Sequence, residues 1–165
     1  AIGTRFAQLG RAIGMNVIAW TFHPDPKKAE DNGFRYVSSL DELLREADVV
    51  SLHLRSSELT RGMIGEREFA TMKTGAIFLN TARGDIVDES ALVSALSSGK
   101  LLGAGLDVFK DEPVPPTNPL LGLPNVVLSP HTAGTTPEAL ANGLMKCAEN
   151  VASFIEKGEV VSRVV

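Results

Sequence analysis

Short apolar runs alternate with longer segments of helical periodicity along most of the chain. The apolar runs predict strands over 16–20, 34–37, 48–54, 76–79, 103–108 and 125–128. Apolar residues at helical spacing predict helices over 4–13, 27–32, 40–47, 66–72, 88–96 and 137–155. Strands that alternate with helices of this length favour an α/β fold, a doubly wound parallel sheet with right-handed crossovers.

Capping residues mark the ends of several of these helices. Ser39 is expected to cap the helix that begins at Leu40, with Glu42 as its reciprocal partner. Gly158 follows the last helix and predicts its end. Cys147 lies within the apolar pattern of that helix, so we expect it to be a buried structural thiol.

Composition narrows the class of protein. The 165 residues suffice for one domain with a proper core. A net charge of −4 suggests neither a nucleic acid nor an anionic membrane as a partner. The single cysteine excludes an internal disulfide and suits a reducing compartment. Without a long apolar run or a signal-peptide pattern, we expect a soluble cytoplasmic protein, and we predict no metal site.

One arginine follows a buried strand directly. The strand 76–79 runs into Asn80-Thr81-Ala82-Arg83-Gly84. Ligands of open α/β sheets bind outside the carboxyl ends of the strands, where a guanidinium can hold a small anion. A surface arginine that caps a loop is the alternative for this residue taken alone. Two later segments, 106–113 and 128–134, favour the anion site.

The start of the chain bears on nucleotide binding. A dinucleotide-binding sheet opens with a strand and a G-x-G-x-x-G turn, and only Gly3, just before the first helix, fits its last glycine. The first strand would then lie upstream of Ala1. Because that strand is central in the order 3-2-1-4-5-6, we do not expect a polypeptide that starts at Ala1 to fold alone.

The position after the second strand concerns the choice of cofactor. Thr21 stands where such folds place an acid that binds the adenosine ribose. A neutral residue there leaves the choice between NAD and NADP open. His23, Lys27 and Lys28 are close enough in sequence to offer positive charge to a 2′-phosphate, although solvated surface side chains are the alternative.

Motifs along the whole chain resemble those of one family. They are Leu43 to Leu54, Thr60 to Gly65, Asn80 to Gly84 with Ile86 to Glu89, Gly105 to Phe109 with Glu112-Pro113, and Asn125 to His131. In this order and spacing the chain resembles the D-isomer-specific 2-hydroxyacid dehydrogenases, which include phosphoglycerate dehydrogenases and glyoxylate reductases.

The resemblance implies a Rossmann-like nicotinamide-nucleotide-binding domain over residues 1–165, incomplete at its N-terminus. In the family the substrate-binding domain is built from the two ends of the polypeptide, and the resemblance implies that this domain is absent here. It also implies a homodimer that pairs through the nucleotide-binding domain.

Three catalytic residues are carried over by the resemblance. Arg83 would bind the carboxylate and keto oxygen of a 2-oxo acid, a bidentate geometry that guanidinium suits. His131 would be the acid/base that exchanges a proton with the substrate oxygen. Glu112 would pair with His131, orient its ring and favour its protonated form.

The cofactor contacts implied by the resemblance are spread over several strand ends. Gly3 at a helix N-terminus would face the pyrophosphate, Thr21 the adenosine ribose, and Asp107 the carboxamide. The full expected set is Ile2, Gly3, Thr21, Leu54, Arg55, Thr60, Thr81, Ala82, Asp107 and Gly134.

The function implied is hydride transfer between NAD or NADP and C2 of a small 2-hydroxy or 2-oxo acid. Glyoxylate, hydroxypyruvate, phosphoglycerate and longer 2-oxo acids stay open as substrates. The formate dehydrogenase branch carries an amide where Glu112 stands, which argues against it. A nucleotide-sensing, partner-binding module like the corepressors that resemble this family is the alternative function. A degenerate structural domain is disfavoured by the intact catalytic set.

Overall fold

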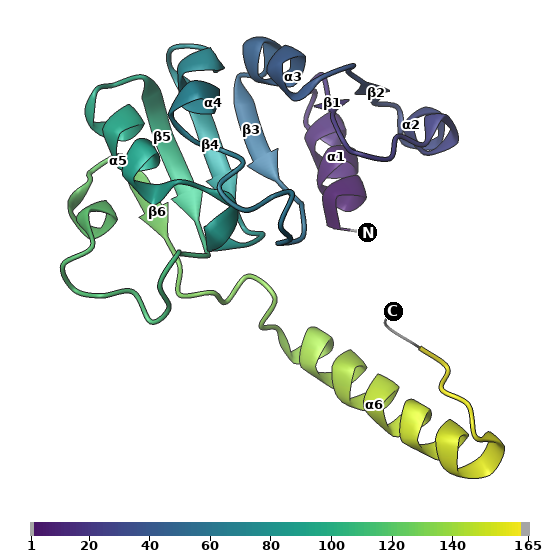
Figure 1. The fold of residues 1–165 in the computed structure, drawn as a ribbon. Coiled ribbons are helices and arrows are strands. Elements are labelled where there is room, and N and C mark those ends of the chain that lie inside the picture. Colours follow the sequence, from purple (N-terminus) through teal and green to yellow (C-terminus); the bar gives the residue numbers. More distant parts are fainter. Residues whose placement is uncertain (1, 163–165) are drawn as a thin grey trace. The chain divides into compact units, whose positions relative to one another are not determined.

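The computed structural model describes residues 2–162 and divides the chain into two compact units, Ala1–Pro130 and His131–Val165. The first unit alternates helices and strands (Figure 1). Its elements are α1 (Ile2–Ala12), β1 (Ile18–Ala19), α2 (Pro26–Asn32), β2 (Arg35–Tyr36), α3 (Leu40–Glu46), β3 (Val49–Leu52), α4 (Glu66–Thr71), β4 (Ala76–Asn80), the 3-10 turn η1 (Gly84–Ile86), α5 (Glu89–Ser97), β5 (Leu101–Leu106), η2 (Pro119–Gly122) and β6 (Val126–Leu128).

The strands pair in parallel, which confirms the predicted fold class. β1 pairs with β2, and β3, β4, β5 and β6 form a four-stranded sheet in that order. A cavity of about 1960 Å³ in this unit is lined from α1, β1, β2, α3 and β3. Residues of both sheets line this cavity, and within residues 2–162 no strand pairing joins the two sheets.

The core lies on one face of the four-stranded sheet. Burial alternates along β4, where Ala76, Phe78 and Asn80 are buried and their neighbours are half-buried. Helices α3, α4 and α5 cover the buried face (Figure 1). Phe69 of α4 meets Phe78 edge to face, with ring centroids 5.3 Å apart. This packing fixes the carboxyl end of β4, which the candidate site uses.

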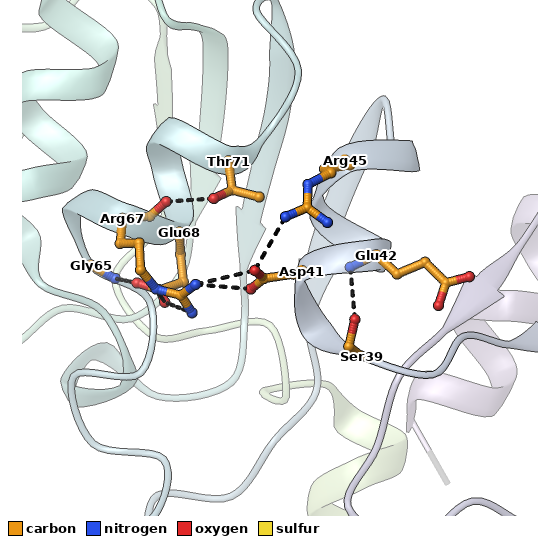
Figure 2. Close-up of polar contacts among 8 residues, drawn as sticks. All are labelled: Ser39, Asp41, Glu42, Arg45, Gly65, Arg67, Glu68 and Thr71. Carbon is orange, nitrogen blue, oxygen red and sulfur yellow. Dashed lines mark hydrogen bonds and ion pairs between the residues drawn. The ribbon is translucent and has the colours of Figure 1, made fainter.

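Ionic contacts join α3 to α4 at the surface (Figure 2). Arg67 Nη1 donates to both carboxylate oxygens of Asp41, at 3.1 and 3.2 Å. Glu68 accepts from the backbone N–H of Gly65 at 3.1 Å and so caps α4. Because Arg67 is largely exposed, these pairs align the two helices while adding little stability.

The predicted capping box of α3 is half right. Ser39 Oγ accepts from the backbone N–H of Glu42 at 3.1 Å, as expected. The reciprocal bond is wrong, because Glu42 Oε2 accepts from both the N–H and the hydroxyl of Ser38, one residue earlier. These bonds from Ser38 hold the pKa of Glu42 below its usual value.

The second unit consists mainly of α6 (Pro137–Lys157). Thr136 Oγ1 accepts from the N–H of Ala139 at 3.1 Å and caps it, and Gly158 ends it with φ 72°, as predicted. Cys147 is exposed, so the prediction of a buried thiol is wrong. The prediction took the apolar pattern of α6 as a sign of burial, whereas within residues 2–162 no residue of this helix is buried. Over the same residues no helix is both long and apolar enough to span a bilayer.

Candidate functional site

Arg83 lies in a turn that is shaped by the last residue of β4. The side chain of Asn80, only 2% exposed, donates to the carbonyl oxygen of Arg83 at 2.9 Å and accepts from the N–H of Ala82 at 3.0 Å. This side chain therefore holds both the residue before Arg83 and Arg83 itself. Asparagine is typical of such turns, but its role here was missed in the sequence because its partners depend on the path of the turn.

The guanidinium of Arg83 is exposed at this carboxyl end of the sheet. Its Nη1 donates to the carbonyl oxygen of Ala82 at 2.6 Å. Within residues 2–162 no ion pair joins Arg83 to a carboxylate. A guanidinium with this surrounding is suited to an anionic ligand.

The loops after β4 and β5 meet at Gly84. A Cβ placed on Gly84 would lie 1.9 Å from the carbonyl oxygen of Phe109, so no residue with a side chain fits there without movement. Glu112 Oε1 accepts from the N–H of Phe109 at 2.9 Å. Arg83 and Glu112, both predicted as catalytic, therefore lie on two loops in direct contact.

The carboxyl ends of β4, β5 and β6 are aligned. The N–H of Asp107 donates to the carbonyl oxygen of Asn80 at 3.0 Å, and that of Ser129 to Leu106 at 3.0 Å. Ser129 Oγ donates to Asp107 Oδ1 at 2.5 Å, and Asp107 is 3% exposed. The carboxylate of Asp107, predicted to meet the cofactor carboxamide, is thus held just after β5 by the residue that follows β6.

His131 is the first residue of the second unit. Its φ of 55° lies in the left-handed region, which residues other than glycine rarely adopt. Such backbone strain is concentrated at functional sites. The structure thus places Arg83 and Glu112 in the first unit and His131, with Gly134 in the turn before α6, in the second.

Three of the predicted cofactor residues line the cavity beside β3. They are Gly3, Thr21 and Leu54. Gly3 lies in the first turn of α1, where a Cβ would be 3.2 Å from the Cβ of His53. A helix N-terminus favours an anion, and glycine leaves room for a pyrophosphate to come close to the backbone there. Partial burial lowers the pKa of His53 and favours its neutral imidazole.

The loop after β3 carries two further predicted residues, Arg55 and Thr60. Thr60 is 4% exposed, and its hydroxyl donates to the carbonyl oxygen of Arg55 at 2.7 Å. The same hydroxyl accepts from the N–H of Ser57 at 2.9 Å. Thr60 therefore shapes the loop that presents Arg55. Ile2, Thr81 and Ala82, the other predicted residues, lie at the start of α1 and after β4.

Comparison with known proteins identifies the family. The family model "D-isomer specific 2-hydroxyacid dehydrogenase, NAD binding domain" matches residues 1–133. The chain belongs to this family. The resemblance noted in the sequence is thereby confirmed, and so is a nicotinamide dinucleotide as the cofactor of the domain.

Individual relatives agree with this membership. A glyoxylate reductase from Aeropyrum pernix is 45% identical over 94% of this chain and 46% of its own length. A D-3-phosphoglycerate dehydrogenase from Archaeoglobus fulgidus is 42% identical over 93% of this chain and 29% of its own. The crystal structure of a glyoxylate reductase from Paecilomyes thermophila superposes with a TM-score of 0.92 at 44% identity, covering 99% of this chain and 49% of that one. The chain thus spans about half or less of the length of these relatives.

Proposed function

We propose that the protein carrying this domain is an oxidoreductase that transfers a hydride between NAD or NADP and C2 of a small D-2-hydroxy or 2-oxo acid. The observation that carries the proposal is the exposed Arg83 at the end of β4, without a carboxylate partner within residues 2–162 and on a loop that touches the loop of Glu112. Family membership supports the same reaction class.

Arg83 is proposed to bind the substrate. Its planar guanidinium can donate two parallel hydrogen bonds to a carboxylate and also reach the adjacent keto oxygen. The turn held by Asn80 limits the freedom of the Arg83 backbone. Such preorganisation lowers the entropy lost when the substrate binds.

His131 is proposed as the acid/base. Imidazole titrates near neutral pH, so it can donate a proton to the carbonyl oxygen during reduction and accept it from the hydroxyl during oxidation. We expect Glu112 to orient the ring and to favour its protonated form.

The remaining predicted residues are proposed to hold the nicotinamide cofactor, which supplies the hydride when bound. Gly3 and Ile2 would face the pyrophosphate, Thr21 the adenosine ribose and Asp107 the carboxamide. Leu54, Arg55, Thr60, Thr81, Ala82 and Gly134 would complete the site around the ribose and the nicotinamide. The choice between NAD and NADP is open in this proposal, because Thr21 carries no charge.

The domain organisation belongs to the same proposal. Residues 1–165 would form the nucleotide-binding domain, and a separate substrate-binding domain would select the acid. Relatives named for glyoxylate and for 3-phosphoglycerate both support a small 2-oxo or 2-hydroxy acid. We further propose a cytoplasmic homodimer, in keeping with the resemblance.

A nucleotide-sensing module that binds protein partners is the alternative, and the test distinguishes the two. The intact protein should oxidise NADH or NADPH with at least one of glyoxylate, hydroxypyruvate, 3-phosphohydroxypyruvate and 4-methyl-2-oxopentanoate, followed at 340 nm. No turnover with any of them, together with peptide partners captured only when cofactor is bound, would replace the proposal by the alternative.

A further inference from the structure

One carboxylate ties the loop that follows β3 to the segment that follows Arg83. Ser56 donates its hydroxyl to Asp85 Oδ2 at 2.5 Å, and Arg61 Nε lies 3.4 Å from the same oxygen. These partners are 29 and 24 residues away in the sequence. A single oxygen, Asp85 Oδ2, therefore contacts residues near both ends of the loop, Ser56 and Arg61.

The backbone forms a seam beside this carboxylate. The N–H of Gly62 donates to the carbonyl oxygen of Asp85 at 2.8 Å, and that of Ile64 to Ile86 at 3.1 Å. Ile64 and Ile86 are 1% and 0% exposed, so this part of the seam is anchored in the core. The side chain of Asp85 extends the seam outward to Ser56.

The loop responds as one piece because it is closed on itself. Thr60 Oγ1 donates to the carbonyl oxygen of Arg55, as described above, and the N–H of Arg61 donates to that of Ser57 at 2.9 Å. A shift of Ser56 and Arg61 away from Asp85 would therefore also move Arg55.

Asp85 is also close to Arg83 along a stretch with little room to adjust. It lies in η1, two residues after Arg83, and the intervening Gly84 is pressed against the backbone of Phe109 and Lys110. A displacement of Asp85 would thus also displace Arg83, because Gly84 between them has little room to adjust.

We propose that Asp85 is a positioning residue that holds the loop 55–61 against η1 and so sets Arg83 and Arg55 relative to each other. The inference rests on the proposed function, in which Arg83 binds the 2-oxo acid and Arg55 lines the cofactor. Asp85 itself touches neither ligand and acts through these two arginines.

The test is Asp85→Ala in the intact protein, assayed with the 2-oxo acid that turns over best. A misplacement of about 1 Å can cost on the order of 100-fold in rate, so we expect KM for the acid to rise at least about tenfold. The Kd for NADH or NADPH, measured by fluorescence titration, should change less. Asp85→Asn keeps an acceptor for Ser56 and should recover part of the loss.

Asp88→Ala is the matched control. The Asp88 carboxylate belongs to the same segment but accepts from the N–H groups of Ser90 and Ala91, at 3.0 and 3.2 Å, and so caps α5. This variant should lower Tm and leave KM within about twofold of wild type, since cap losses act on stability. Equal KM values for Asp85→Ala and Asp88→Ala would overturn the positioning role.

Two further readouts separate the clamp from the activity. Ser56→Ala added to Asp85→Ala should raise KM no further, because both changes break the same bond, and an additive effect would contradict the clamp. Amide hydrogen exchange over residues 55–64 should be faster in Asp85→Ala than in wild type or Asp88→Ala. Unchanged exchange would overturn the clamp. Absence of turnover in the wild type would instead reject the proposed function, and the positioning role with it.

Discussion

The position of the Arg83 loop against the Glu112 loop depends on Gly84, which has no side chain. Gly84 lets the loop after β4 approach the backbone of Phe109 and Lys110, so that the arginine and Glu112 belong to one packed pair of loops. The requirement is for space, because the Cβ of any other residue would fall 1.9 Å from the Phe109 oxygen. The position of a Cβ is fixed by its own backbone and the oxygen of Phe109 is itself a backbone atom, so a rotamer change cannot relieve the clash.

We therefore predict that Gly84→Ala separates the two loops. Overpacking of this kind costs about 1–3 kcal/mol of stability and should also raise KM for the 2-oxo acid, because Arg83 moves with its loop. Thermal unfolding and steady-state kinetics of the intact protein measure both effects. Gly122→Ala is the control, since a Cβ there meets nothing within 4 Å, and its stability should stay within about 0.5 kcal/mol of wild type. A Gly84→Ala protein with the Tm and KM of the control would contradict this account of the loops.

For single residues, the sequence predicts a position along the chain more readily than a contact between distant loops. Arg83 and Glu112 each follow a predicted strand, and the structure places them in the loops after β4 and β5. Gly84 and Asp85 owe their roles to partners that lie 24 to 29 residues away, such as Arg61 and Ser56. A pattern of neighbouring residues carries no information on such contacts, which depend on how two loops meet.

The pair formed by the loop after β3 and η1 is held partly by charge, which makes it sensitive to pH. The hydrogen bond from Ser56 holds the pKa of Asp85 below its ordinary 3.8, and Arg61 acts in the same direction. A carboxyl whose folded pKa is lowered stabilises the fold above its unfolded pKa and loses that contribution as pH falls through the folded pKa.

We accordingly predict that the stability difference between wild type and Asp85→Asn is constant from about pH 5 to 7 and narrows below about pH 4. Urea unfolding midpoints of the intact protein between pH 3 and 7 measure this difference. When Ser56 is replaced by alanine in both proteins, the stability difference between Asp85 and Asp85→Asn should be smaller at each pH measured. A difference that stays unchanged down to pH 3, or widens, would show that the charge of Asp85 contributes nothing to the contact.

Helices and strands were predicted well where their own sequence determines them. Each predicted apolar run overlaps a strand and each helical pattern overlaps a helix, because periodicity reflects local geometry. β1 and β2 shrink to two residues each, since their extent depends on pairing that the pattern does not reveal. Cys147 was wrongly placed for a related reason: periodicity shows that α6 has an apolar face but not whether that face is covered.

At the scale of the whole molecule, the three residues proposed as catalytic are divided between the two units of the chain. Arg83 and Glu112 belong to the first unit and His131 to the second. The chain spans about half the length of the glyoxylate reductases that it matches, and less of the phosphoglycerate dehydrogenase. In the proposed function Arg83 binds the carboxylate of the acid, and residues outside this domain recognise the rest of the substrate.

The central claim is that Arg83 binds the 2-oxo acid and His131 exchanges its proton, and one comparison tests it most directly. Turnover of the best 2-oxo acid and the Kd for NADH or NADPH are measured for the intact wild type, Arg83→Ala and His131→Ala. Each variant should lose turnover by orders of magnitude while cofactor affinity stays nearly unchanged, because neither side chain is proposed to hold the cofactor. Normal turnover in either variant would contradict the account.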